Sequence, residues 1–387
     1  MADRRRVYEV WKGNNIFLFN GRVILGPDAR ILIVAILMFT VPAVTFCIFV
    51  AWHLVHRFPA YNAGYAILVV SIVFTIYVLA LLLFTATRDP GIVPRNLHPP
   101  EVSESDRSVA AGLGMHFPRA KEIMVNGMPM WVKYCDTCML YRPPRCSHCS
   151  RCDNCVEKFD HHCPWVGQCI GKRNYRYFFM FISSAALLSI FVFAMSALYI
   201  KFLTDDYGTV WKAMKHSPAS VILMAYCFFC LWFVGGLSSF HLYLISTNQT
   251  TSETFRRRRN AYDGADRRPN VFDKGCFGNF FEVFCTKIQP SRNDFRAFVQ
   301  EEAPEPAIQL PILEESVDEY VEGRRAKVED DLEIGNHIFT LSRRRDLDEA
   351  GDIKTRSSNR SSRETSGDEV DLGSDLQPPA LHPETRP

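Results

Sequence analysis

The chain has 387 residues, of which 48% are apolar and 13% aromatic, and its formal net charge at pH 7 is +2. A charge so close to neutrality argues against a dedicated nucleic-acid-binding protein, which carries a strong basic excess. Long apolar runs concentrate before residue 284, whereas the stretch after Pro290 is charged, contains Ser and Pro, and is poor in aromatic residues. Such a composition cannot bury enough surface to offset the entropy of ordering, so we expect residues 291–387 to form a largely disordered tail.

Four long apolar runs follow a basic segment that spans residues 1–30, and none of the runs contains Asp, Glu, Lys or Arg. At about 1.5 Å of rise per residue, each run is long enough as a helix to cross a hydrocarbon core of about 30 Å. The alternative, that the runs are buried core helices of a soluble protein, does not account for four uncharged runs of this length. The runs are residues 31–52, 64–87, 177–200 and 219–245.

These runs predict an α-helical polytopic membrane protein, with helices 1 and 2 in residues 31–87 and helices 3 and 4 in residues 177–245. The loop of residues 88–176 and the stretch of residues 256–268 are rich in Lys and Arg, and the two other loops are much less basic. Because basic loops stay on the cytosolic side, we expect both termini, the 88–176 loop and a juxtamembrane segment, residues 246–290, in the cytosol. We expect the protein in the plasma membrane or in the Golgi and other endomembranes.

The central loop contains a dense cluster of candidate metal ligands, eight Cys and three His between Cys135 and Cys169. Two tetrahedral zinc ions need eight ligands, and Cys pairs at three-residue intervals are normal in such sites. The spacing alone does not assign ligands to ions, and three groups are left over. If two of these are His161 and Cys163, a base and a thiol lie side by side on a metal-stiffened loop, as nucleophilic thiol chemistry requires. The spacings indicate reduced, metal-bound thiols and not a disulfide framework.

The order of residues in this loop resembles the Cys-rich zinc domain of the DHHC-type protein S-acyltransferases, or palmitoyltransferases, which we expect at about residues 133–183. The likeness extends over roughly residues 25–290, and residues 6–13 look like the plant members of the family. So long a pattern is very specific. The matching residues are Cys135-x2-Cys138, Arg142-Pro143-Pro144-Arg145, His148-Cys149, Cys152-x2-Cys155, Asp160-His161-His162-Cys163-Pro164-Trp165, Cys169, Asn174, Phe178, Asp89-Pro90-Gly91 and Thr250-Thr251-Ser252-Glu253.

The resemblance implies two structural zinc ions held by interleaved sets of ligands. Each shell is closed by four protein ligands, which leaves no open position for a substrate, so the ions would hold a loop that has little core of its own. Cys146 is a further thiol that the family does not require, and it is either inert or an alternative ligand. The implied sets are Cys135, Cys138, His148 and Cys155 for one ion and Cys149, Cys152, His162 and Cys169 for the other.

The resemblance also implies a catalytic thiol at Cys163 and a protein-cysteine S-palmitoyltransferase activity. Cys163 would attack a long-chain acyl-CoA such as palmitoyl-CoA, release CoA, and pass the acyl group from a thioester to cysteines of substrate proteins, a two-step ping-pong mechanism. His161 would take the thiol proton, and Asp160 would fix the His161 tautomer and stabilise its cation. The alternative, that Cys163 is another zinc ligand, fails on the count because eight other ligands suffice. Trp165 either lines the thioester or packs the loop.

Binding of acyl-CoA requires an apolar cavity and cationic groups. A cavity between the four helices would take the acyl chain, since ligand sites between bundle helices are common. For the CoA phosphates we consider Arg142, Arg145, Lys172 and Arg173, although ordinary positive charge on the cytosolic side explains these residues at least as well. After the fourth run, the Thr250-Thr251-Ser252-Glu253 segment matches a capping box that begins a short helix, which we interpret as structural support.

Two other classes of function fit the pattern less well. A membrane-tethered zinc module, or a ubiquitin ligase of the RING type, does not need the Asp160–His161–Cys163 arrangement, and RING spacing differs from the spacing here. A transporter or channel for ions is expected to carry acidic or basic residues at the membrane midplane, and the apolar runs offer none. The expected partners are therefore acyl-CoA, membrane lipid and substrate proteins with accessible cysteines, and no nucleic acid.

Overall fold

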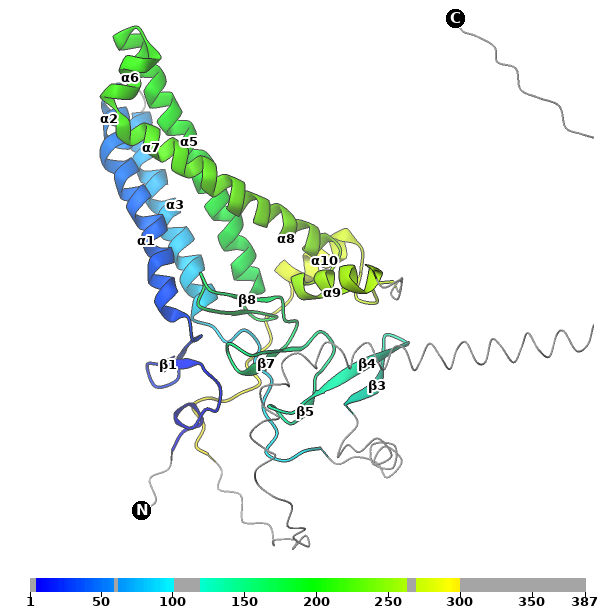
Figure 1. Ribbon diagram of the computed structural model, residues 1–387. Helices are drawn as coiled ribbons and strands as arrows, with labels where there is room; N and C mark the ends of the chain where they lie inside the picture. Colours follow the sequence, from blue (N-terminus) through cyan, green and yellow to red (C-terminus); the bar gives the residue numbers. More distant parts are fainter. Residues whose placement is uncertain (1–4, 59–61, 101–118, 263–268, 300–387) are drawn as a thin grey trace, which may run out of the picture. The chain divides into compact units, whose positions relative to one another are not determined.

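The computed structural model describes residues 5–58, 62–100, 119–262 and 269–299, and the statements below refer to these residues. Four helices in this part of the chain are long and apolar enough to cross a membrane, and Cys-rich hairpins lie between the second and the third (Figure 1). The expected fold class is thereby confirmed. Of the expected tail, residues 300–387 lie outside the described residues.

The first and fourth spans are each built from three helical segments joined end to end, of which the middle one is a wider π-helical turn, and the second and third spans are each one continuous helix. A π turn shifts the helix register locally and so redirects a span. The second such turn lies directly before α8, which diverges from α1 and α3 toward α9 and α10 in Figure 1. The segments are α1 (Ala29–Phe46), η2 (Cys47–Ala51) and α2 (Trp52–Arg57) in the first span, α3 (Ala63–Ala86) in the second, α5 (Tyr175–Tyr207) in the third, and α7 (Pro218–Cys230), η4 (Leu231–Gly235) and α8 (Gly236–Ser246) in the fourth.

The packed interior of the spans is apolar, and the outward faces are apolar as well. Phe46, Val78 and Leu82 are fully buried where α1, α3 and α5 meet, while Ile33 and Val41 on α1 are more than half exposed. A helix that is hydrophobic all round suits a lipid environment, in which outward side chains contact acyl chains.

The remaining elements are short and lie outside the spans. The strands form antiparallel hairpins, with β4 shared between β3 and β5. These elements are η1 (Val7–Glu9), β1 (Ile16–Leu18), β2 (Val23–Leu25), β3 (Ala120–Val125), β4 (Met128–Cys135), β5 (Leu140–Tyr141), β6 (Ser147–Cys149), β7 (Asn154–Val156), β8 (His161–Cys163), β9 (Gln168–Ile170), α6 (Val210–His216), α9 (Thr251–Tyr262) and α10 (Cys276–Phe284).

Two buried amides attach the last hairpin to the membrane helices. The Nε2 group of Gln168 donates to the backbone oxygens of Thr85 at 3.0 Å, Ala86 at 2.6 Å and Arg88 at 2.9 Å, which are the free carbonyls at the end of α3. Asn174, directly before α5, donates to the oxygens of Thr85 at 3.2 Å and Cys169 at 2.9 Å. Helix carbonyls without an intrahelical partner need such donors when they are buried. The hairpin is therefore held at the end of two spans.

Residues 5–28, which precede α1, and residues 291–299 pack together on the hairpins. The backbone N–H of Tyr8 donates to the oxygen of Phe295 at 2.9 Å. The Phe295 ring is 5% exposed and lies 5.1 Å from the Trp11 ring and 5.2 Å from the Phe17 ring. The packed part of the chain thus extends beyond Pro290 to residue 299, because the buried Phe295 ring and backbone hydrogen bonds to residues 5–8 anchor this segment.

We expect Gln168→Glu to destabilise the protein strongly, because it places carboxylate oxygens against carbonyl oxygens that now accept hydrogen bonds. The cost of losing buried donors is about 1–3 kcal/mol for each unpaired group, and a buried charge adds to it. The measurement is the thermal unfolding midpoint of the detergent-purified protein. Gln289→Glu, at an exposed side chain, is the matched control and should leave the midpoint unchanged. Equal midpoints for the two variants would contradict the proposed anchoring.

Candidate functional site

Three successive hairpins of the Cys-rich loop share one architecture. Each begins its turn with a cysteine, and the cysteine is paired across the hairpin with the first residue of the returning strand: Cys135 with Leu140, Cys149 with Asn154, and Cys163 with Gln168. Each turn ends on a residue with positive φ, at Met139 (51°), Asp153 (52°) and Gly167 (83°). The repeated geometry places equivalent side chains at equivalent positions.

The ligand sets interleave because each metal cluster takes two cysteines from one turn and a His–Cys pair from the next hairpin. The first cluster combines Cys135 and Cys138 with His148 and Cys155, which face each other across β6 and β7. The second combines Cys149 and Cys152 with His162 and Cys169, which face each other across β8 and β9. Two ions would therefore connect the three hairpins in series.

The distances within both clusters fit a tetrahedral zinc ion. The Nδ1 atom of His148 lies 3.5 Å from the sulfurs of Cys135 and Cys138 and 3.8 Å from that of Cys155. In the second cluster, Nδ1 of His162 lies 3.4–3.7 Å from its three sulfurs. Zinc–sulfur bonds of about 2.3 Å and zinc–nitrogen bonds of about 2.0–2.1 Å at tetrahedral angles give a nitrogen–sulfur separation of about 3.6 Å.

A carboxylate contacts the Nε2 atom of each of the two candidate ligand imidazoles, His148 and His162. Nε2 of His162 lies 2.8 Å from Oδ2 of Asp28, and Nε2 of His148 lies 3.4 Å from Oδ1 of Asp153. A carboxylate on Nε2 keeps the proton there and leaves Nδ1 free to bind metal. Asp28 comes from the residue before α1 and also pairs with Arg151 at 2.6 Å. The start of the first span is therefore linked to the second cluster.

The approach of Asp28 to this cluster requires a glycine. A Cβ atom at Gly26 would lie 2.2 Å from the backbone oxygen of Gly167, which is closer than atoms can pack. The N–H of Asp28 donates to the same oxygen at 3.3 Å. The chain can therefore enter α1 beside the third hairpin only because residue 26 has no side chain.

Cys163 is the equivalent of Cys149 in the third hairpin, yet it belongs to neither cluster. Val166 occupies the position that Cys152 occupies in the second hairpin, and it is 1% exposed. Cys163 is 8% exposed and packs in the same apolar cluster as Val166 and Phe178 of α5. The third hairpin thus repeats the metal-binding turn with its second sulfur replaced by an apolar side chain, and one thiol is left without a metal to bind.

His161 and Asp160 accompany this thiol. Nδ1 of His161 lies 2.6 Å from Oδ2 of Asp160, and because a carboxylate only accepts, the imidazole donates. Burial lowers the pKa of His161, but hydrogen bonds and charge from Asp160 and Cys163 outweigh burial and raise that pKa to about 9. Burial raises the pKa of Asp160, but its bonds to His161 and to Thr251 outweigh burial, so its pKa is below the usual range.

Asp160 is held from its other side by the start of α9. The backbone N–H of Thr251 donates to Oδ1 of Asp160 at 2.9 Å, and its hydroxyl donates to Oδ2 at 2.8 Å. The expected capping box is present, with the Glu253 N–H donating to the Thr250 hydroxyl at 3.2 Å and the Thr250 N–H donating to Glu253 at 2.9 Å. A carboxylate at a helix N-terminus is favoured by the helix dipole. The segment after the fourth span therefore fixes the carboxylate next to His161.

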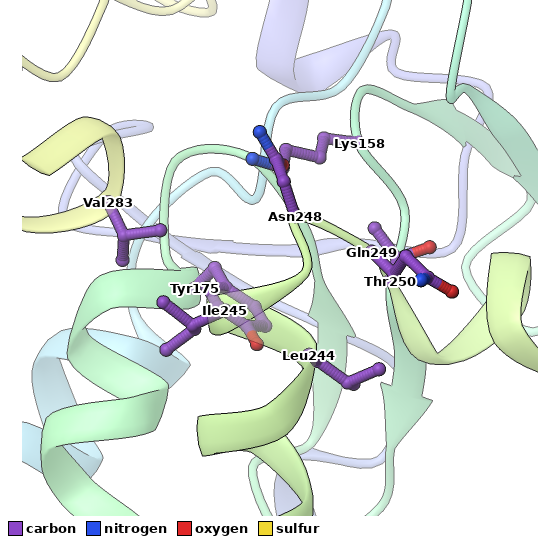
Figure 2. A pocket seen from close by; sticks show the side chains of 8 residues that line it. All are labelled: Lys158, Tyr175, Leu244, Ile245, Asn248, Gln249, Thr250 and Val283. Atoms are coloured by element: carbon purple, nitrogen blue, oxygen red, sulfur yellow. The ribbon is translucent and has the colours of Figure 1, made fainter. Parts of the chain in front are cut away.

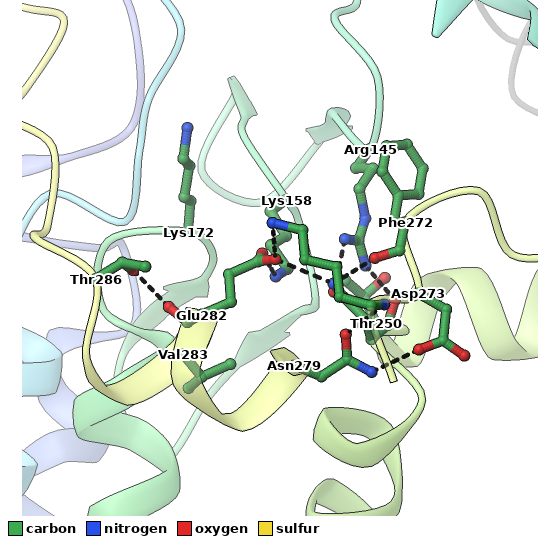
Figure 3. Close-up of polar contacts among 12 residues, drawn as sticks. Arg145, Lys158, Lys172, Thr250, Phe272, Asp273, Asn279, Glu282, Val283 and Thr286 are labelled. Carbon is green, nitrogen blue, oxygen red and sulfur yellow. Dashed lines mark hydrogen bonds and ion pairs between the residues drawn. The ribbon is translucent and has the colours of Figure 1, made fainter. Parts of the chain in front are cut away.

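Arg145 locks α9 to the Cys-rich hairpins. Its guanidinium makes a bidentate pair with Glu253, at 2.7 and 2.8 Å, and donates to the side-chain oxygen of Asn248 at 2.9 Å (Figure 3). The ring of Phe272 lies 4.6 Å from the guanidinium carbon. A bidentate, stacked arginine is geometrically specific. Arg145, expected as a CoA-phosphate candidate, is thus engaged in holding the site together.

The other candidate cofactor-binding residues differ in how much of their charge is already paired. Arg173 pairs with the buried Asp89 at 2.8 Å, and Lys172 pairs with Glu157 at 3.3 Å while its side chain stays 44% exposed. Within the described residues, the buried Nε of Arg142 has no hydrogen-bond partner. Trp165, next in the chain to Pro164, is 53% exposed.

A second polar network lies beside Arg145 and positions α10. Lys158 and Lys274 contact the two oxygens of Glu282 at 3.1 and 3.0 Å (Figure 3). Burial, and then the charge of Arg145, lower the pKa of Lys158. A small pocket adjoins this network (Figure 2). Its lining residues are Lys158, Tyr175, Leu244, Ile245, Asn248, Gln249, Thr250 and Val283.

Two residues of the site escape an inspection of motifs. Asp28 precedes the first span, and His241 on α8 has a ring 6.0 Å from that of His161. Thr251, which contacts Asp160, lies in the motif that the sequence analysis interprets as structural support. A signal for His241 was present, because a titratable residue inside an apolar span is a functional candidate by default. Asp28 carries no comparable signal, since a helix-capping aspartate is common.

Comparison with known proteins agrees with this geometry. Residues 130–258 match the DHHC palmitoyltransferase family. Protein S-acyltransferase 8 of Arabidopsis thaliana is 59% identical over 356 residues, which cover 89% of this chain and 86% of the relative. Probable protein S-acyltransferase 9 of the same plant is 52% identical over 98% of this chain and 91% of the relative. Probable protein S-acyltransferase 7, also from that plant, is 54% identical over 83% of this chain and 73% of the relative.

We expect Asp28→Asn to weaken zinc binding at the Cys149 cluster about 10- to 100-fold, because loss of the carboxylate behind a ligand imidazole has that effect on metal sites. The measurement is release of zinc from the purified protein to a chromophoric chelator. The Cys135 cluster, backed by Asp153, is the internal control, so release should become biphasic. Two ions that leave together, at the rate of the unaltered protein, would contradict the role of Asp28.

Proposed function

This chain belongs to the DHHC palmitoyltransferase family and is a protein S-acyltransferase, and on that premise we propose that Cys163 carries the acyl group between acyl-CoA and substrate proteins. The observation that supports the assignment is the grouping of Asp160, His161 and Cys163, in which Asp160 accepts a hydrogen bond from His161 at 2.6 Å and the Cys163 sulfur lies outside both metal clusters. A thiol beside an oriented imidazole is the arrangement that activates a cysteine nucleophile.

The charge state of His161 sets the reactivity of this thiol. With its pKa raised to about 9, His161 is a cation at neutral pH, and a cation beside a thiol stabilises the thiolate. The Asp160 carboxylate, below its usual pKa, keeps that cation oriented through Nδ1. In this mechanism His161 takes the proton of the Cys163 thiol, and Asp160 keeps the resulting imidazolium oriented.

In the first step the Cys163 thiolate attacks the thioester carbonyl of acyl-CoA. A carbon–sulfur bond to Cys163 forms, the carbon–sulfur bond to CoA breaks, and the departing CoA thiolate takes the proton from His161. Burial of Cys163 among Val166 and Phe178 limits the access of water, which would hydrolyse the new thioester.

In the second step a cysteine of the substrate protein gives its proton to His161 and attacks the acyl group on Cys163. The thioester bond to Cys163 breaks, and the sulfur leaves as a thiolate beside the restored imidazolium. Protons and electrons balance over the two steps, and neither step requires an oxidant or a further reactant. The same residue acts as acid in one step and as base in the other.

We assign two structural zinc ions to the two clusters, with the ligands expected from the sequence. Closed shells of three thiolates and one imidazole supply rigidity and no open position for substrate. This supports a role in holding the third hairpin, since each hairpin contributes little apolar core of its own.

The acyl chain and the CoA moiety would meet at Cys163. The preferred acyl donor is a long-chain acyl-CoA such as palmitoyl-CoA, whose chain would enter between the spans beside α5. Lys172 and Arg142 are the better candidates for the CoA phosphates, because the Lys172 side chain is 44% exposed despite its pair with Glu157 and the Arg142 Nε has no partner among the described residues, whereas the side chains of Arg145 and Arg173 are 8% and 19% exposed and paired. Trp165, exposed beside the thiol, would face the acyl chain or the substrate.

The topology proposed for the protein places the chemistry at the cytosolic face of a membrane. Basic segments favour both termini in the cytosol, in the plasma membrane or the Golgi and other endomembranes. The division into a cytosolic segment of residues 1–30, two pairs of spans, the central loop and a juxtamembrane segment of residues 246–290 stays a prediction. Protein substrates would present cysteines close to the lipid surface, and no nucleic acid is involved.

Replacement of the nucleophile tests the assignment directly. We expect the purified protein to take up radiolabelled palmitate from palmitoyl-CoA as a hydroxylamine-sensitive label, and Cys163→Ser to take up none, because a serine hydroxyl at this site is not ionised. The zinc content of the variant should stay at about two ions per chain. Cys146→Ser, which removes a buried thiol outside both clusters, is the matched control and should keep both label and zinc. Label retained by Cys163→Ser would refute the role of this residue.

The role of Asp160 can be measured without any acyl donor. Asp160→Asn removes a carboxylate that raises the pKa of His161, so transfer of the thiol proton from Cys163 to His161 becomes less favourable. We expect alkylation of Cys163 by iodoacetamide, followed by peptide mass spectrometry, to slow about tenfold, since one pKa step corresponds to about 1.4 kcal/mol. Asp136→Asn, at an exposed position, should react like the unaltered protein. An unchanged rate in Asp160→Asn would show that the carboxylate does not act on the thiol.

A further inference from the structure

His241 is a buried titratable residue that the chemistry proposed above does not use. It lies on α8, within the fourth span, and is 1% exposed. Its ring nitrogen, a nitrogen of His161 and an oxygen of Asp160 all lie within 4.8 Å of one another. Polar side chains are costly inside a membrane span and are normally retained there for a function.

The partner of His241 is the hydroxyl of Tyr175. This oxygen lies 3.0 Å from Nδ1 of His241. Tyr175 is the first residue of α5, and its ring lies beside Leu244 and Ile245 of α8 (Figure 2). With the hydroxyl donating, Nδ1 accepts and the neutral imidazole carries its proton on Nε2. The bond therefore joins the start of the third span to the fourth span at the level of the catalytic hairpin.

The rings of Phe178 and His241 form one wall around the His161 side chain. Phe178 is 5.3 Å from the His161 ring and 5.1 Å from the His241 ring, in both cases near edge-on, and the two imidazole rings are 6.0 Å apart. Edge-on packing of this kind restricts ring rotation. On its other side, His161 is fixed through Nδ1 by Asp160 at 2.6 Å. A rotation of His161 toward α8 would require Phe178 or His241 to move.

We propose that Tyr175 and His241 are positioning residues, which hold the His161 ring in the orientation that serves the Cys163 thiol. This inference rests on the proposed function of Cys163 and His161. The hydroxyl–imidazole bond fixes the His241 ring, and the His241 ring, with Phe178, fixes the angle of the His161 ring. Because the Tyr175–His241 bond joins α5 to α8, the distance between these two helices also affects the site. A displacement of α8 would allow the His161 ring to rotate.

A different function for the same residues would be a third metal site formed by Asp160, His161 and His241. The geometry favours positioning over this alternative, because Oδ2 of Asp160 and Nδ1 of His161 are 2.6 Å apart and share a proton. Two ligand atoms on one metal ion with bonds of about 2.0–2.1 Å normally stand farther apart than that. Zinc stoichiometry distinguishes the two alternatives in the experiment below.

The experiment compares single-turnover acylation of Cys163 by palmitoyl-CoA in four variants of the full chain. Tyr175→Phe removes the hydroxyl, His241→Phe keeps an aromatic ring without nitrogens, and His241→Asn keeps an acceptor near the position of Nδ1. We expect the first two to lower the maximum rate about tenfold, with the half-saturating palmitoyl-CoA concentration unchanged, since one buried hydrogen bond corresponds to that scale. His241→Asn should recover most of the rate. The double variant Tyr175→Phe/His241→Phe should be no more than about twofold slower than either single variant, because coupled residues are not additive.

Three results would overturn the inference. These are an unchanged rate in both single variants, a rise in the half-saturating concentration at constant maximum rate, and fully additive losses in the double variant. A zinc content of about three in the unaltered protein that falls to about two in His241→Phe would establish metal binding instead. If His241→Phe does not fold, the acylation rate of Tyr175→Phe alone tests the inference. Tyr177→Phe, on the same helix, is the matched control and should keep the full rate.

Failure of this inference is distinguishable from failure of the proposed function. Cys163→Ser and His161→Ala are measured in parallel. If Cys163→Ser still acquires label, the proposed function is wrong. If Cys163→Ser acquires none and the Tyr175 and His241 variants keep the full rate, only the positioning role is wrong.

Discussion

The site depends on one buried carboxylate. Asp160 is 1% exposed and accepts hydrogen bonds from His161 on one side and from the first residue of α9, Thr251, on the other. A buried carboxylate is costly unless it is fully bonded, so the hairpin and the segment after the fourth span must both be in place for the charge to be tolerated. Folding of the C-terminal segment and assembly of the catalytic group are thereby coupled. Arg145 strengthens the coupling, since its pair with Glu253 holds the same helix start.

The reactive thiol arises from a structural repeat. Three hairpins present a cysteine at the same turn position, and in the first two that cysteine belongs to a metal cluster. The third turn carries Val166 where the second carries Cys152, and Gln168, on the returning strand, is bonded to the end of α3. The turn of the last hairpin therefore packs against apolar side chains, whereas the turns of the other two hairpins hold candidate metal ligands. The same scaffold thus places the Cys163 sulfur outside both clusters.

The membrane helices take part in the site and do not only anchor it. α5 begins directly after the third hairpin, so Phe178 contacts the His161 ring from within the span and Tyr175 contacts His241. α8, which follows the π turn η4, contributes His241.

Sequence reasoning was reliable where the signal is local. Uncharged runs of the right length predicted the four spans, a count of ligands left three groups beyond the eight that two zinc ions need, and the matching motifs indicated the family and the ligand sets that exclude Cys163. It was least informative about charged side chains. Arg145 and Arg173 look like free cationic groups in the sequence, but each is paired with a carboxylate far away along the chain.

The sequence by itself determined the class of protein, the number of spans and the residues available for metal and thiol chemistry, because hydrophobic run length and ligand spacing are properties of neighbouring residues. The tertiary structure alone decided that Asp28 contacts a ligand of the second cluster, that Thr251 donates to Asp160, and that His241 lies beside His161. These contacts depend on how spans and hairpins pack, and the sequence does not show which residues from distant segments will meet.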